Sequence, residues 1–294
     1  MESKKYLILN SFITMLAPMI WGTTYWVTTV MLPPESPLTT SVLRALPAGI
    51  LLLLLVRQFP RGIWWGRIFL LGALNIGIFF YCLFVAAYRL PGGIAAILMA
   101  IQPIIVLALS YIMFKQPIRF MQILAGVIGI ISIFLLVWHP VTSLDPIGIL
   151  AGIAGAVSMA CGIVLTKHWG MPPGVNLLGS TGWQLVFGGV ILLPIALFSE
   201  GIPHVLSGMN IAGFLYLSLI GGLLAYVIWF RGIQRLPAVS ISFIAFGSPL
   251  TATLLGIILL DESFSLAQII GILGVTIAIV LAQKTSVSAS KKLV

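Results

Sequence analysis

Apolar runs fill this chain of 294 residues from one end to the other, and only short polar or Pro/Gly-rich breaks separate them. Each run is close to the roughly 20 residues that an α-helix needs to cross a hydrocarbon core. The pattern predicts an all-α polytopic membrane protein. Its ten expected transmembrane helices cover residues 7–30, 38–57, 66–88, 92–114, 119–138, 146–166, 176–198, 209–231, 237–260 and 266–284.

Composition supports placing these runs in a lipid bilayer. Hydrophobic residues make up 60% of the chain and charged residues only 7%, whereas about a quarter of a typical soluble domain is charged. No stretch is long and polar enough to form a separate soluble domain. The first apolar run has no small-residue cleavage site, so we expect a retained helix and not a removed signal peptide.

The basic residues predict the orientation. With the N-terminus in the cytoplasm, 13 of the 15 lysines and arginines fall on the cytoplasmic side, as the positive-inside rule requires. Both termini are then cytoplasmic, and most acidic residues lie on the outer side. The net charge of +9 follows this rule, and no Lys/Arg-rich run with interleaved aromatic residues indicates a nucleic-acid partner.

The two halves of the chain share a spaced motif. Arg89-Leu90-Pro91, Gln102-Pro103 and Gln122 recur 146 positions later as Arg235-Leu236-Pro237, Ser248-Pro249 and Gln268. Five helices per half turn the second copy upside down in the membrane. We therefore expect two inverted five-helix repeats, over residues 1–144 and 145–294, with a substrate site near mid-membrane at their interface.

The same residues resemble a known family over essentially the whole chain. Trp21-Gly22-Thr23-Thr24-Tyr25 with Arg44–Gly49 is similar to the start of an EamA repeat, within the drug/metabolite transporter superfamily. Asn75–Phe80, Ala86–Gly93 and Trp229–Gly232 resemble its PecM-like subgroup. EamA repeats often carry an acidic residue after the fourth helix, and Lys115-Gln116 departs from that pattern in the first half.

Aromatic and polar residues at helical spacing are the candidate substrate contacts. Trp21, Thr24 and Tyr25 form one stripe of the first span, which lines a cavity or belongs to an interfacial aromatic belt. Asn75 and Phe79 form a second stripe, in which Asn75 joins helices or contacts the ligand. The further candidates are Tyr81, Tyr226 and Trp229.

Two polar-proline pairs interrupt matching spans. Gln102-Pro103 and Ser248-Pro249 are either plain kinks or substrate-facing hinges, since proline removes a helical hydrogen bond. Arg44 is expected in the outer part of the second span, away from the ends of that span, where an unpaired guanidinium is costly. It either reaches the outer surface and bonds carbonyls or Glu35, or meets a substrate carboxylate in an outer vestibule.

These features predict a secondary transporter that exports a small organic metabolite across the inner membrane by alternating access. The resemblance implies an amino-acid-like, aromatic or pigment-like substrate. We expect no cofactor, no metal and no catalytic residue, and we expect a monomer or homodimer. Cys82 and Cys161 both fall in apolar spans.

The alternatives to a transporter are a membrane-embedded enzyme and a non-transporting receptor or structural protein. All six acidic residues lie at helix ends, in loops or at the terminus, which favours a substrate that is not a lipophilic cation.

Overall fold

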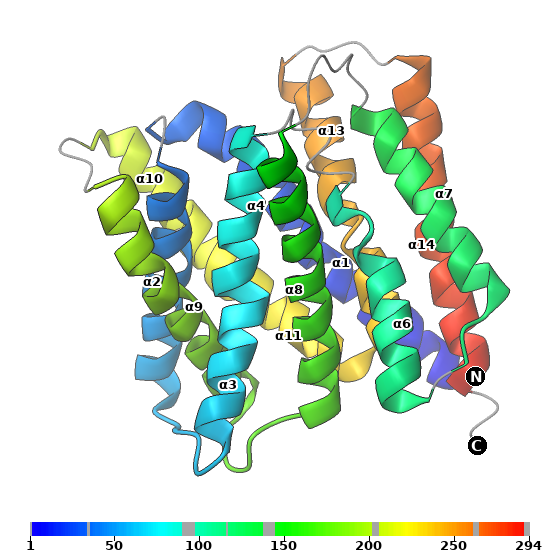
Figure 1. Cartoon of the computed structure of the whole chain (residues 1–294), viewed down its shortest axis with the longest axis horizontal. Coiled ribbons are helices and arrows are strands. Elements are labelled where there is room, and N and C mark those ends of the chain that lie inside the picture. Colours follow the sequence, from blue (N-terminus) through cyan, green and yellow to red (C-terminus); the bar gives the residue numbers. More distant parts are fainter. Residues whose placement is uncertain are drawn as a thin grey trace.

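The computed structural model describes residues 2–33, 36–89, 98–115, 117–137, 145–201, 206–260 and 265–290. Within these ranges the chain is helical and contains no β-strand. The helices stand side by side in one bundle (Figure 1). Six helical segments are long and apolar enough to cross a membrane, and four more are apolar but shorter.

The described helices of the first half follow the expected ranges closely. Only η1 is a π-helix, and residues 90–97 lie outside the described chain. The elements are α1 (Glu2–Met31), α2 (Pro37–Val56), α3 (Trp64–Gly72), η1 (Ala73–Gly77), α4 (Ile78–Arg89), α6 (Gln102–Phe114) and α7 (Phe120–Val137).

The second half has a corresponding series, in which η2 is again a π-helix. Its elements are α8 (Pro146–Trp169), α9 (Leu177–Ser199), α10 (Gly208–Tyr216), η2 (Leu217–Leu224), α11 (Ala225–Arg235), α12 (Ala238–Ile244), α13 (Gly247–Leu260) and α14 (Leu266–Ser290). The ten apolar segments of the described chain overlap the ten predicted ranges, although α6 begins only at Gln102 and the range 237–260 is divided between α12 and α13.

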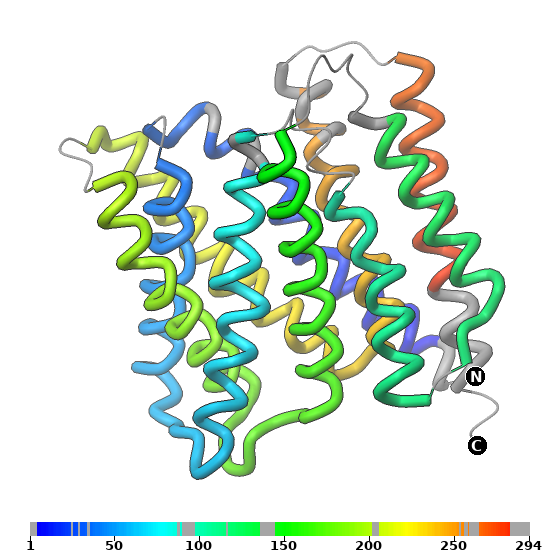
Figure 2. Tube along the Cα trace, viewed as in Figure 1, coloured from blue at the N-terminus to red at the C-terminus, as the bar shows by residue number. Residues whose placement is uncertain are grey.

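Long-range helix pairs hold the bundle together. Helix α2 packs along α9, α4 along α8, α1 along α13, and α7 along α14, as Figures 1 and 2 show. Small residues permit the closest approaches. At Gly222 in η2, an added Cβ would strike the backbone oxygen of Arg44 in α2, so glycine is required where these two helices meet.

Two apolar segments contain a break at related places. In the second half α12 ends at Ile244, and α13 begins at Gly247 after a two-residue turn. In the first half α6 begins at Gln102 after a turn at residues 100–101. Pro103 and Pro249 lie in the first turn of the helix that follows each break, where the missing proline N–H costs no helical hydrogen bond.

The two ends of the bundle differ in charge. Helices α2, α6, α8 and α11 all end at its lower end in Figure 1, and Arg57, Lys115, Lys167 and Arg235 lie at those ends. Helix α1 begins and α14 ends at this same end (Figure 1). Helix α8 begins and α9 ends at the opposite end.

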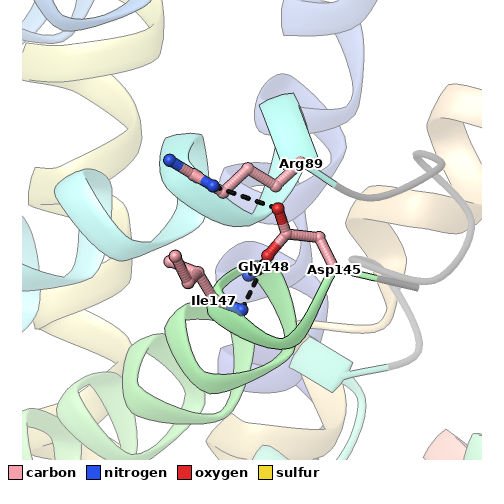
Figure 3. A network of polar contacts seen from close by, with 4 residues as sticks. All are labelled: Arg89, Asp145, Ile147 and Gly148. Atoms are coloured by element: carbon pink, nitrogen blue, oxygen red, sulfur yellow. Dashed lines mark hydrogen bonds and ion pairs between the residues drawn. The ribbon is translucent and has the colours of Figure 1, made fainter.

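At the opposite end, carboxylates cap two helices. Asp145 accepts hydrogen bonds from the backbone N–H groups of Ile147 (2.7 Å) and Gly148 (3.2 Å), and pairs with Arg89 at 3.0 Å (Figure 3). These N–H groups, chiefly that of Gly148, and the Arg89 guanidinium hold the pKa of Asp145 below its usual value. The carboxylate of Glu200, which follows α9, likewise accepts from the first turn of α2.

Candidate substrate site

An aromatic cluster lies where α1 crosses α11. The Trp21 ring centroid is 5.0 Å from that of Tyr226 and 5.2 Å from that of Trp229, both in tilted arrangements. Tyr226 and Trp229 are among the largest fully buried side chains of the described protein. They lie one turn apart on α11, so both reach the same face of α1. The structure thus brings together three of the residues predicted from sequence.

A backbone carbonyl joins this cluster to α2. The oxygen of Gly221 accepts hydrogen bonds from Trp21 Nε1 at 3.0 Å and from Arg44 Nη2 at 3.3 Å. Gly221 lies in η2, whose i→i+5 pattern differs from that of an α-helix. Single π-turns inside α-helices are frequent at functional sites. Glycine has no side chain, so nothing in the sequence indicated this oxygen as a shared acceptor.

Arg44 lies against the cluster from the side of α2. Its guanidinium carbon is 5.3 Å above the centre of the Phe80 ring, and Phe80 in turn lies 6.3 Å from Tyr226. Arg44 is partly buried, and its Nε is buried without a hydrogen-bond partner. No carboxylate in the described part of the chain pairs with it. The sequence predicted that Arg44 bonds backbone carbonyls or Glu35. The structure shows its bond to the Gly221 carbonyl, and Glu35 lies outside the described residues.

Two further donors of this region lack partners. Trp229 Nε1 is buried and makes no hydrogen bond, although its ring is fully enclosed. Thr24 Oγ1, on the turn after Trp21, is also buried without a partner. The Tyr25 side chain lies outside the described part of the structure. Buried polar groups of native proteins are nearly always satisfied, so these two groups mark polar positions for which the described chain supplies no partner.

Asn75 has a different environment. Its Nδ2 donates to Gln184 Oε1 in α9 at 2.9 Å and to Thr166 Oγ1 in α8 at 3.2 Å. A Cβ on Gly162 of α8 would overlap Asn75 Oδ1, so the amide is tightly enclosed. The geometry shows Asn75 joining three helices, which was one of its two expected roles.

The aromatic residues after η1 do not all face the way the spacing predicted. Phe80 enters the cluster, whereas Phe79 is partly buried beside it, with the two ring centroids 5.7 Å apart. Tyr81 is 41% exposed, although its repeat counterpart Tyr226 is buried. A π-turn contains one residue more than an α-turn. The insertion of η1 therefore shifts the helical register between Asn75 and the residues that follow Gly77.

The remaining candidate residues, Gln102 and Ser248, lie beside the two helix breaks. Gln102 is buried, and its Nε2 has no partner. Ser248 is partly buried, and its backbone oxygen would lie 2.7 Å from a Cβ on Gly22. The break before α13 therefore contacts α1 one residue beyond Trp21.

A cavity of about 430 Å³ lies between α1, α10 and α13. Its lining is mainly apolar, and it includes Thr23 and Tyr216, whose hydroxyl oxygens are 2.7 Å apart. Tyr216 immediately precedes η2, and Thr23 follows Trp21 by two positions. Neither residue was predicted as part of the site. The aromatic motif around Trp21 is the only sequence signal that points to Thr23.

Comparison with protein families shows that the chain matches the EamA-like transporter family twice, over residues 9–138 and over residues 146–283. The chain belongs to this family. It is therefore a membrane transporter, whose surroundings are the lipid bilayer and whose cargo is a small molecule.

Individual relatives of this EamA-like transporter agree with the family match. Protein PecM of Dickeya dadantii is 46% identical over 94% of this chain and 93% of its own length, which confirms the resemblance to the PecM-like subgroup. The uncharacterized inner membrane transporter YedA of Escherichia coli is 29% identical over 89% of this chain and 86% of its own length. Together with its apolar helices, these relatives identify the chain as a multi-pass inner membrane protein.

A solved structure shares the fold of this EamA-like transporter. It superposes with a TM-score of 0.79 at 18% sequence identity, covering 94% of this chain and 97% of that one.

Proposed function

We propose that the chain is a secondary transporter that exports a small organic metabolite by alternating access. The observation that carries this proposal is the composition of the aromatic cluster. Trp21, Arg44 and Phe80 come from the first half of the chain, and Gly221, Tyr226 and Trp229 come from the second. A site shared between two halves is what a transporter with repeats places near mid-membrane.

Two matched irregularities support an arrangement of ten transmembrane helices in two inverted repeats, residues 1–144 and 145–294. First, η1 and η2 occupy corresponding places in the third and eighth spans, a few residues before Tyr81 and Tyr226. Second, the helix breaks precede Pro103 and Pro249, which are 146 positions apart. Irregular backbone at membrane depth is tolerated where it is buried in protein or lines a cavity.

The breaks supply the proposed moving parts. A break leaves backbone groups outside the regular helix, so the segments on either side can change their angle without disrupting a continuous hydrogen-bonded ladder. Pro103 and Pro249 would then act as hinges, with Gln102 and Ser248 at the edge of the substrate path. The break before α13 contacts α1 beside Trp21, which would couple the hinge to the cluster.

The charges support cytoplasmic termini and a mechanism without a buried carboxylate. The basic end of the bundle is the end at which α1 begins and α14 ends, as the positive-inside rule requires of a cytoplasmic face. The described acids Asp145 and Glu200 both lie at helix ends, where they cap helices. We propose facilitated efflux or exchange of a neutral, zwitterionic or anionic metabolite that is amino-acid-like, aromatic or pigment-like.

The test begins with the substrate. Metabolites that accumulate inside a deletion strain and appear in the medium of a complemented strain are the candidates, and each is then supplied to proteoliposomes containing the purified chain. A transporter moves the solute across the membrane, an enzyme converts it, and a receptor does neither. Trp21→Ala and Trp229→Ala should each lower the transport rate at least tenfold while the folded fraction stays near normal.

The matched control is Trp65→Ala, because Trp65 packs edge-to-face against Trp183, with ring centroids 4.7 Å apart, outside the cluster. Loss of transport only in step with loss of folded protein, or equal loss in all three variants, would contradict the assignment of the site.

A further inference from the structure

The cluster contains more hydrogen-bond donors than acceptors. Arg44 Nε and Trp229 Nε1 are both buried without partners, and neither group can accept a hydrogen bond. The Gly221 oxygen is the acceptor shared by Trp21 and Arg44. A carbonyl oxygen has two lone pairs, so these two donors already fill it. The described residues therefore supply no acceptor for these two donors.

The positive charge of Arg44 is also weakly compensated. Its hydrogen bond to the Gly221 oxygen is long, at 3.3 Å, and its guanidinium carbon lies 5.3 Å from the centre of the Phe80 ring. An arginine within a membrane span ordinarily pairs with an acid or faces a hydrated cavity. Within the described ranges the only ion pair is that of Arg89 with Asp145, at the end of the bundle. Arg44 is thus a partly buried cation whose counter-charge the described chain does not supply.

The walls around these donors are aromatic. Trp21 lies between the two groups, because it shares the Gly221 oxygen with Arg44 and stacks within 5.2 Å of Trp229. Phe80 and Tyr226 complete the wall on the side of Arg44. Flat apolar surfaces beside a guanidinium suit a ligand that combines a planar apolar body with an oxyanion.

We propose that the substrate carries a carboxylate or a similar oxyanion that binds Arg44, while its planar body packs against the cluster of Trp21, Tyr226 and Trp229. This inference rests on the proposed function and specifies the substrate class of the same site. The oxyanion replaces the Gly221 carbonyl as the partner of Arg44, and Gly221 then bonds Trp21 alone. Trp229 Nε1 donates to a second acceptor of the ligand.

The experiment compares two probes of nearly equal shape, 2-naphthoate and 2-naphthamide. The full-length protein in lipid nanodiscs is titrated with each probe by isothermal calorimetry. The carboxylate should bind at least tenfold more tightly than the amide, because charge-assisted hydrogen bonds to a guanidinium are lost with the amide. This comparison uses the unaltered protein, so it does not depend on whether a variant folds.

Variants then locate the effect. Arg44→Gln should remove the preference for the carboxylate, and Arg44→Lys should retain part of it, because lysine keeps the charge but loses the planar fork. Arg67→Gln is the matched control, since Arg67 also stacks on aromatic rings, Trp64 at 5.0 Å and Trp169 at 5.4 Å, outside the cluster. It should leave the preference unchanged.

The outcomes separate the inference from the proposed function. Equal affinity for the two probes would overturn the oxyanion assignment and leave the aromatic site standing. A carboxylate preference that persists in Arg44→Gln, or that disappears in Arg67→Gln, would also overturn it. Failure of both probes to bind the unaltered protein would overturn the inference together with the site on which the proposed function depends.

Discussion

Replacing Gly162 by alanine should reveal how tightly Asn75 is enclosed. The new Cβ would overlap Asn75 Oδ1 and lie 2.6 Å from its Cγ, so the amide has to leave its position. In leaving, it gives up the hydrogen bonds to Gln184 and Thr166. Asn75→Ala removes the same two bonds directly. The two substitutions therefore damage the same contact, and their effects should not add.

The magnitude follows from these contacts. Hydrogen bonds between membrane helices contribute about 0.6 kcal/mol each on average and up to about 1.7 kcal/mol. The buried oxygen of Gln184 that is left unpaired adds about 1–3 kcal/mol. Removing Asn75 Oδ1, which is itself buried without a partner, offsets part of this loss, so we expect Asn75→Ala to cost about 2 kcal/mol of unfolding free energy. Gly162→Ala should cost about the same, reduced by up to about 1 kcal/mol because alanine favours the helix over glycine.

The double variant gives the sharpest result. With the amide already absent, Gly162→Ala should be neutral or stabilising, so that the pair shows a coupling of about 2 kcal/mol. Reversible unfolding by SDS in mixed micelles measures each free energy. Gly66→Ala serves as the control, because a Cβ there meets nothing within 4 Å. Additive losses in the double variant would refute the described enclosure of Asn75.

Three further outcomes are expected. Asp145→Asn keeps the helix cap but removes the charge. Because the pKa of Asp145 in the folded state is lowered, its contribution persists at neutral pH and is lost only as pH falls below the ordinary range of an aspartate. The two proteins should therefore differ in thermal unfolding at pH 7.5 and approach each other only at the acidic end of a pH series, and convergence by pH 6 would contradict this. A pH gradient imposed on proteoliposomes should not drive uphill accumulation; accumulation that the gradient drives and that no single acid substitution abolishes would refute the inference that a transporter without a membrane carboxylate is not coupled to protons. An alkaline phosphatase fused after Val294 should be inactive, since the C-terminus is predicted to be cytoplasmic, and full periplasmic activity would contradict the ten-helix count.

The extents of the helices were predictable because apolar length is a strong and local signal. The break before α13 was also anticipated, since Ser248-Pro249 repeats Gln102-Pro103 at a fixed separation. The exact form of the break was not. Each proline begins a helix instead of kinking one, because the chain leaves the helical path just before it.

The candidate site was predicted only in part. Trp21, Tyr226 and Trp229 were found because large aromatic residues at turn spacing leave a clear pattern. Phe80 was missed in favour of Phe79, because η1 shifts the register and no residue type announces a π-turn. The Gly221 oxygen belongs to the backbone, so its role depends on the fold alone.

The short helices created by the two breaks bear on how the protein is built in the cell. At about 1.5 Å per residue, the 13 residues of α6 span about 20 Å, less than the roughly 30 Å of a hydrocarbon core. The transfer of such a short segment by itself from the translocon into the bilayer releases little free energy. Helix α6 packs against α8 and α12, and α7 packs against α14. We therefore expect stable integration of α6 and α7 to depend on synthesis of the second half, and ribosomes stalled before residue 146 should expose a protease-sensitive segment around these two helices.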